Sequence, residues 1–331
     1  MRTPILPLAL AAAALAWSLQ PGDPAAIGVA RADRSAPGPE RLQIWQALLS
    51  AEPGLDAQTA HRLVPVLALV NPEPVARLPR SQQAAVLRFA VPRLDGPPRA
   101  SRCWAPGTPS ELIEAFHAIE EAARAQAPPE EGDAPPPPAT RFDRRWSRTA
   151  TDGGQQGQQG RPITLTWSIV PDGTPIPTNR LIGDSAGPSD LRRFLSRLYP
   201  DSDPAGDPRE QPWFPVLAGA FENIASKTGI RYVYEAQDDG LILGADSNGV
   251  LGVRGDIRLS GHPIDGERGT LAYNYFPNGG DMVIDTNDPW FEGSPLRLAN
   301  TIEHEHCHGL GAEHVCPGDN TKLMEPVINL N

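Results

Sequence analysis

Three histidines near the C-terminus have the spacing of a metal site. His304 and His308 are four residues apart, so on a helix they project from one face, one turn above the other. Two imidazoles in this arrangement can bind one zinc ion, and Glu305 is offset from His304 by about 100°, beside the metal without binding it. Gly311 can adopt the left-handed backbone that ends a helix, which would allow the chain to return His314 as a third ligand.

These residue types predict hydrolytic chemistry. Three neutral histidines leave zinc its positive charge and one open position, and the pKa of a water bound there falls to about 7. Glu305 is the predicted general base, accepting a proton from this water as it attacks a peptide carbonyl. A histidine-rich surface helix and a structural zinc site are the alternatives. His61, His117 and His262 lack the spacing of metal ligands. His306 lies on another face of the predicted helix, and Cys307 is expected to pack in the core.

The C-terminal half of the chain resembles the matrixins, a family of metzincin metallopeptidases. The signature HExxHxxGxxH is complete from His304 to His314. The sequence LMEP at residues 323–326 resembles the family's methionine turn, with Met324 below the zinc and Pro326 in the matching proline position. The resemblance covers residues 162–331 and implies a secreted zinc endopeptidase of the bacterial type.

The resemblance implies an α+β fold of the zincin type. Its parts are a twisted mixed sheet with an antiparallel edge strand, a long active-site helix and the methionine turn, preceded here by a small helical region. Residues 271–276 would be the edge strand, which pairs with an extended substrate. The sequence stops at Asn331, before the helix that follows the methionine turn in the family, so either it is a fragment or the domain closes without that helix.

The resemblance also suggests which further metals are bound. Matrixins hold a second, structural zinc, but the corresponding positions here carry poor zinc ligands: Arg258, Ser260, Tyr273 and Val283. One zinc per chain is therefore expected. Aspartates at family calcium positions, with carbonyls of glycine-rich turns, predict calcium binding instead: Asp265, Asp285 and Asp288, with Asp281 in a second site. Ordinary loop aspartates would give the same pattern.

Cys103 is a candidate latency switch, in which the thiolate of a prosegment occupies the open position on zinc. Arg102-Cys103 followed by Pro106 resembles part of the matrixin motif. Three positions depart from it: Ser101, Trp104 and Gly107. The incomplete motif favours the alternative, a buried or disulfide-bonded Cys103. The sequence assigns no pair among the three cysteines, Cys103, Cys307 and Cys316.

The chain divides into four predicted segments. Residues 1–32 have a basic start and an apolar, alanine-rich run, and predict a signal peptide, with an uncleaved anchor as the alternative. Residues 33–127 carry apolar residues at helical spacing and predict a small helical region, a candidate prosegment. Residues 128–161 are rich in proline, glycine and glutamine, and predict an exposed linker. Residues 162–331 are the predicted catalytic domain.

Apolar patterning places the elements of that domain. Strands are predicted at residues 163–170, 230–236, 250–259, 271–276 and 281–286. Helices are predicted at residues 189–199, 213–229 and 295–310.

Composition limits the partners. A net charge of −11 argues against nucleic acid or an anionic membrane as the main partner. The expected function is hydrolysis of protein or peptide substrates outside the cell, free of the membrane after signal removal. A catalytically inactive binding or scaffold module of the same fold is one alternative, and an interaction role for the helical region is another. The sequence does not indicate an oligomeric state.

Overall fold

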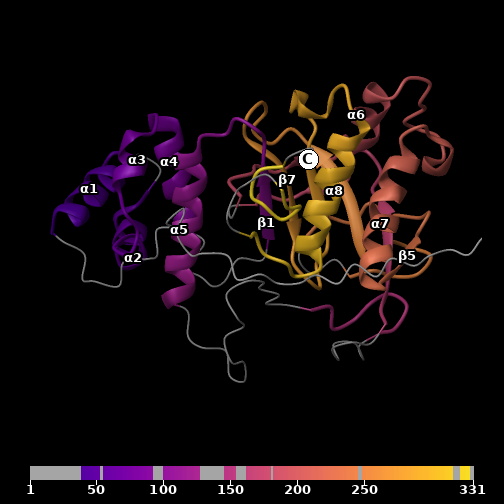
Figure 1. Cartoon of the computed structure of the whole chain (residues 1–331), viewed down its shortest axis with the longest axis horizontal. Coiled ribbons are helices and arrows are strands. Elements are labelled where there is room, and N and C mark those ends of the chain that lie inside the picture. Colours follow the sequence, from indigo (N-terminus) through magenta and orange to yellow (C-terminus); the bar gives the residue numbers. More distant parts are fainter. Residues whose placement is uncertain are drawn as a thin grey trace, which may run out of the picture.

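The computed structural model describes residues 39–52, 55–91, 100–126, 145–153, 162–179, 182–244, 248–315 and 321–328. The predicted signal peptide and most of the predicted linker lie outside these ranges. Two parts follow one another along the chain (Figure 1). We call helices α1 to α5 the helical unit, and residues 145–328 the α/β unit.

The helical unit has its own apolar core. Its helices are α1 (Pro39–Ser50), α2 (Ala57–Leu67), α3 (Glu73–Arg77), α4 (Arg80–Ala90) and α5 (Ser110–Gln126). Leu63, Val86 and Ile119 are fully buried where the helices meet. Burying each such side chain stabilises the fold by about 1.5–3 kcal/mol. Trp45 is also buried, and its indole N–H donates a hydrogen bond of 3.0 Å to the carbonyl of Val70.

A six-stranded mixed sheet forms the centre of the molecule, in the order β1-β7-β8-β6-β2-β5. Its strands are β1 (Ala100–Trp104), β2 (Thr164–Ile169), β5 (Arg231–Tyr234), β6 (Ile257–His262), β7 (Thr270–Tyr275) and β8 (Met282–Asp285). Strands β5, β2, β6 and β8 are parallel, whereas β7 is antiparallel to β8 and β1 is antiparallel to β7. A small separate hairpin joins β3 (Pro175–Ile176) and β4 (Gly187–Pro188).

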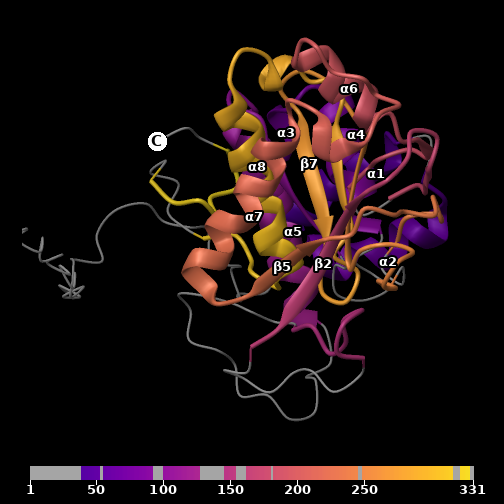
Figure 2. The ribbon, with the colours of Figure 1, turned by 90° about the vertical axis from the view of Figure 1, so that its right-hand side faces the viewer.

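Helices cover the sheet and position the candidate site. They are α6 (Leu191–Leu198), α7 (Phe214–Thr228) and α8 (Pro295–Gly309), with short 3-10 turns η2 (Pro208–Glu210) and η3 (Pro289–Phe291). Helices α7 and α8 lie side by side along the sheet (Figures 1 and 2). Trp167 on β2 stacks on Phe221 of α7, with ring centroids 4.7 Å apart. The mixed α and β architecture expected from the sequence is therefore present.

The edge of the sheet differs from the prediction. Residues 271–276 were expected to form the edge strand, but β1 pairs with β7 along its length, from Ala100 opposite Tyr275 to Trp104 opposite Thr270. The prediction of an edge at β7 is wrong because it considered the catalytic part alone. A strand from the N-terminal region completes the sheet (Figure 1).

The predicted linker is not uniform. Residues 145–153 lie inside it, yet Trp146 is only 5% exposed and belongs to the core of the α/β unit. None of the described helices is both long and apolar enough to cross a membrane.

Candidate metal centre

Helix α8 and the chain that follows it bring three imidazoles together. The Nε2 atoms of His304 and His308 are 3.1 Å apart, those of His308 and His314 are 3.2 Å apart, and those of His304 and His314 are 3.3 Å apart. A tetrahedral zinc with Zn–N bonds of 2.0–2.1 Å requires nitrogens about 3.3 Å from each other. The triangle of nitrogen atoms therefore has the size that one zinc ion needs.

Hydrogen bonds on the far side of the rings fix the direction of their lone pairs. The Nδ1 atom of His304 lies 2.6 Å from the carbonyl of Leu323, and that of His308 lies 2.7 Å from the carbonyl of Ala312. A carbonyl only accepts, so both Nδ1 atoms carry the proton and both Nε2 atoms are bare when the rings are neutral. Bare nitrogens facing one another at this distance repel unless a cation lies between them, so the residues fit a metal ion.

Burial holds these imidazoles neutral. It lowers the pKa of His308 to about 4, and it lowers the pKa of His304 well below its ordinary value, with the charge of His308 as the next cause. Metal binding requires neutral imidazole, so zinc would displace no proton from these two rings at neutral pH. His306, on the other side of α8, is also buried, which lowers its pKa to about 3, and it bonds Tyr232 at 2.7 Å. It is a core residue.

Glu305 lies beside the histidines and is fully buried. Burial raises the pKa of its carboxyl to about 8, although the thiol and backbone amide of Cys103 act in the opposite direction. A carboxyl with a pKa near the working pH can both take and return a proton. In this arrangement, however, no solvent reaches it.

Strand β1 is what covers Glu305. Ligand atoms of Cys103, His304 and Glu305 all lie within 4.8 Å of one another, as do those of the three histidines. Cys103 is completely buried and is not joined to Cys307; Cys316 lies outside the described residues. Burial raises the pKa of its thiol well above the usual value, and the charge of Glu305 adds to this. The structure thus places the candidate switch residue at the metal centre.

Two segments hold β1 in this position. On one side it pairs with β7, and on the other its Trp104 N–H donates to the carbonyl of Pro326 at 2.9 Å. The N–H of Ile328 returns a bond of 3.1 Å to the carbonyl of Trp104. β1 therefore lies as an extended strand between β7 and residues 326–328, directly over the metal centre.

The turn after α8 is fixed by its backbone. Gly311 has a φ of 96°, and its N–H bonds the carbonyl of His308 at 2.8 Å. Met324 accepts a hydrogen bond of 2.8 Å from the N–H of Val315 through its carbonyl, which ties residues 321–328 to the segment carrying His314. The side chain of Met324 is partly buried.

The candidate calcium residues lie together in part. The Asp285 carboxylate accepts hydrogen bonds from the backbone N–H groups of Ile264, Asp265, Gly266 and Asn287. Burial, and then the charge of Asp285, raises the pKa of Asp265 to about 6; burial likewise raises that of Asp288 to about 6. Asp281 is buried elsewhere, bonded to the N–H of Gly244. Among the described residues, these aspartates do not form a cluster with ligand atoms within 4.8 Å.

Arg258, one of the four residues at the positions where matrixins hold their structural zinc, forms an ion pair. Arg258 forms a two-pronged bond with Asp238, at 2.9 and 2.7 Å, and neither side chain is more than 1% exposed. The cation that the fold holds here is a guanidinium.

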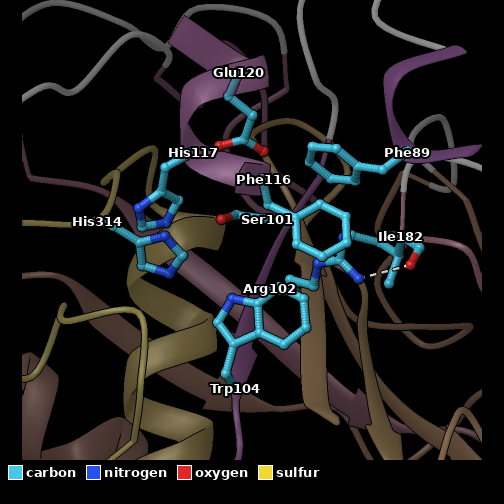
Figure 3. Close-up of a pocket in the computed structure, with 9 residues that line it drawn as sticks. All are labelled: Phe89, Ser101, Arg102, Trp104, Phe116, His117, Glu120, Ile182 and His314. Atoms are coloured by element: carbon cyan, nitrogen blue, oxygen red, sulfur yellow. Dashed lines mark hydrogen bonds between the residues drawn. The ribbon is translucent and has the colours of Figure 1, made fainter. Parts of the chain in front are cut away.

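Helix α5 adds a residue that the sequence did not single out for the site. His117 lies beside His314, with ring centroids 5.4 Å apart (Figure 3). A cavity of about 10 Å³, roughly the space of one water, lies between the two units at this point. Only the tertiary fold brings α5 here, so no spacing in the sequence could have indicated it.

Known proteins resemble the chain in this same region. Residues 253–331 match the family model described as matrixin. The C-terminal part of this chain is matrixin-like. A stretch of 71 residues is 42% identical to matrix metalloproteinase-16 of Rattus norvegicus, Homo sapiens and Mus musculus. It makes up 19% of this chain and 11% of each relative, so the chain spans about a tenth of the length of these relatives.

Proposed function

We propose that the protein is a zinc-dependent endopeptidase. The observation that carries the proposal is the triangle of Nε2 atoms from His304, His308 and His314, with sides of 3.1–3.3 Å and the lone pairs of His304 and His308 directed inward. The matrixin-like sequence of this segment supports a metallopeptidase, with protein or peptide as substrate. Zinc is the metal that three histidines with one open position favour.

The chain's own residues supply the rest of the chemistry. Zinc held by the three histidines would polarise the scissile carbonyl and acidify a water. Glu305 accepts the proton of the attacking water and delivers it to the leaving amine, since its carboxyl stands next to His304. An extended substrate would pair with β7 and with residues 326–328, the two segments that now hold β1.

Replacing Glu305 by Gln tests this function. Metal analysis of the full chain should give one zinc per chain in wild type and variant alike, because the ligands remain. Proteolytic activity on casein, measured after limited proteolysis has removed the helical unit, should fall by about 100-fold or more. Glu303→Gln is the matched control, since Glu303 lies on the same helix but bonds Asn223 at the surface. Digestion of casein by Glu305→Gln at the wild-type rate would overturn the role of Glu305, whereas no digestion by either protein would support an inactive binding module.

We also propose that β1 and the helical unit keep the enzyme latent. β1 occupies the backbone groups that a substrate strand would use, and Cys103 stands where its sulfur can reach the open position on zinc. Thiolate is a strong zinc ligand. His304, Glu305 and His308 are buried, with β1 next to Glu305 and His117 of α5 next to the partly buried His314.

Removal of the thiol tests the latency. Full-length Cys103→Ala should digest casein faster than full-length wild type, while Cys307→Ala, which removes the partly exposed thiol of α8, should match wild type. Equal activity of wild type and Cys103→Ala before any processing would rule out the switch. It would leave the endopeptidase proposal intact.

Export and calcium binding complete the proposal. Residues 1–32 support secretion, and mass spectrometry of the exported protein would locate the new N-terminus. The raised pKa values of Asp265 and Asp288 show that their charged forms are disfavoured in the fold. A calcium ion nearby would stabilise these charged forms, which supports calcium binding.

A further inference from the structure

The segment before the first strand of the α/β unit reaches the metal centre from behind. Trp146 donates a hydrogen bond of 2.8 Å from its indole N–H to the carbonyl of Gly309, 163 residues away. Its ring is packed into the same core as α8. Gly309 is the last residue of α8 and directly follows the ligand His308.

The carbonyl of Gly309 belongs to the end of a helix, where carbonyls lack a partner within the helix. A fixed external donor therefore sets the direction of this peptide group. The neighbouring peptide groups already serve the site: His308 accepts from Gly311 through its carbonyl, and its ring bonds the carbonyl of Ala312. A shift of the backbone at residue 309 would therefore displace both the proposed ligand His308 and the carbonyl of Ala312 that orients its ring.

Strand β7 also leaves the backbone of Gly309 little room to move. A Cβ atom at this position would lie 2.7 Å from the side-chain nitrogen of Asn274 on β7. The peptide is thus held between β7 and Trp146.

The ring of Trp146 also fixes a second element. A Cβ atom on Gly280, in the turn between β7 and β8, would lie 2.7 Å from two carbons of the indole. Next to it, the N–H and hydroxyl of Ser147 both bond the Asn278 side-chain oxygen, at 2.7 and 3.1 Å. Trp146 therefore joins the turn after β7 to the end of α8.

The contacts that hold this segment come from the α/β unit. The N–H of Ala150 bonds the Asp256 carboxylate at 2.7 Å, and Thr149 pairs with Gly153. These contacts do not involve the helical unit, so they would persist if that unit were released.

We propose that Trp146 is a positioning residue for the metal centre, and that the working catalytic unit includes residues 145–153. This inference rests on the proposed zinc site. Trp146 acts through the carbonyl of Gly309 on the ligand His308, and it touches neither metal nor substrate. A strap of the chain that composition alone assigns to a linker would then be part of the catalytic unit.

The test measures metal retention in the full chain. Trp146→Phe keeps an aromatic ring but loses the N–H, and benzothienylalanine at position 146 keeps the indole shape without it. Trp45→Phe is the matched control, because it removes an equivalent buried bond to a carbonyl in the helical unit. Zinc release to a chromophoric chelator and the visible spectrum of the cobalt-loaded protein are the readouts.

Both changes at position 146 should release zinc at least about fivefold faster than wild type and alter the cobalt spectrum. Trp45→Phe should leave both readouts unchanged, even where it lowers thermal stability. Release from both position-146 variants at the wild-type rate would overturn the inference. So would faster release from Trp146→Phe alone, because ring volume and not the hydrogen bond would then be responsible. A wild-type protein that binds no zinc would contradict the proposed function itself.

Discussion

At the scale of single residues, Arg102 connects three parts of the molecule. Its guanidinium carbon lies 4.3 Å from the ring centroids of Trp104 and Phe116, and 4.9 Å from that of Phe89 (Figure 3). It also donates a hydrogen bond of 2.7 Å to the carbonyl of Ile182 in the α/β unit. A buried cation needs such partners, and each cation–π contact contributes about 0.5–2 kcal/mol. Arg102 thus holds β1 against both units.

Arg102→Met should loosen β1. Losing the bond to Ile182 and the ring contacts should weaken docking by about 2 kcal/mol, which corresponds to an open fraction about 30-fold larger. Hydrogen exchange of the β1 and β7 amides should accelerate, and casein digestion by the full chain should increase. Arg88→Met, on the exposed side of α4, is the control and should change neither. Unchanged exchange in Arg102→Met would mean that backbone pairing alone secures β1.

Asp265 predicts a pH dependence of stability. Because its pKa is raised in the folded state from 3.8 to about 6, the folded protein holds a proton that the unfolded chain loses between pH 4 and 6. Calcium-free protein should therefore lose stability from this group as the pH rises through that window, with no further loss above it. A change of about 1 kcal/mol corresponds to about 2–4 °C in Tm.

Thermal melts between pH 4 and 7 check this expectation. Asp265→Asn should show a weaker fall in Tm with rising pH than wild type, and added calcium should raise the Tm of wild type more than that of the variant. Asp201→Asn, at an exposed turn, provides the control. Identical slopes for wild type and Asp265→Asn would show that Asp265 does not titrate in this range.

At the scale of elements, the regular helices and strands follow from local pattern. Helix α8 was predicted at residues 295–310 and spans Pro295–Gly309, since its apolar spacing and Gly311 are both local signals. The strand predicted at residues 250–259 begins only at Ile257, because residues 251–253 form a turn closed by a bridge between Val250 and Arg254. β1 could not be predicted, because ASRCW forms a strand only where β7 offers an unpaired edge.

The same contrast applies to the site. His304, Glu305 and His308 lie on one helix, so their geometry is contained in their spacing. Cys103 and Trp146 come from distant parts of the chain, and only packing brings them to α8. Sequence reasoning could name Cys103 from its motif but could not place it, and Trp146 lay inside an apparent linker.

The ion pair of Arg258 and Asp238 fixes the segment between β5 and β6, and its removal should be costly. Burial opposes ionisation of Asp238, but the guanidinium outweighs it and lowers the carboxyl pKa. Arg258→Met leaves that buried carboxylate without its cation and should cost about 3–5 kcal/mol of the free energy of unfolding. Urea unfolding of Arg258→Met, Asp238→Leu and the double variant would measure the coupling. The double variant should recover at least half of the loss; simple additivity would show that the pair is not coupled.

At the scale of the whole molecule, the helical unit and β1 cover the candidate site, and β1 is also a strand of the sheet of the α/β unit. Strand β1 lies between α4 and α5 in sequence, yet its partners in the sheet belong to the α/β unit. Removing the helical unit would therefore also have to free one strand from the sheet.

Labelling of Cys103 should report this separation. The thiol is fully buried, so an alkylating reagent should not modify it in the intact protein. During limited proteolysis, modification of Cys103 and casein digestion should rise together, as followed by mass spectrometry of the Cys103 peptide. Cys307 serves as the internal reference, because it lies on α8 and is partly exposed. Full activity while Cys103 stays protected would contradict a cover that must leave.

The pairing of β1 with β7 also has a consequence for biosynthesis. Residues 100–104 leave the ribosome well before their partners at residues 270–275, and those partners precede the ligands on α8 and His314. Domains at the N-terminus fold first during synthesis, so the helical unit can be complete while the sheet is still forming. We expect β1 to join the sheet before the last histidine arrives. A newly made chain would then pass through no stage in which a finished active site stands open inside the cell that produces it.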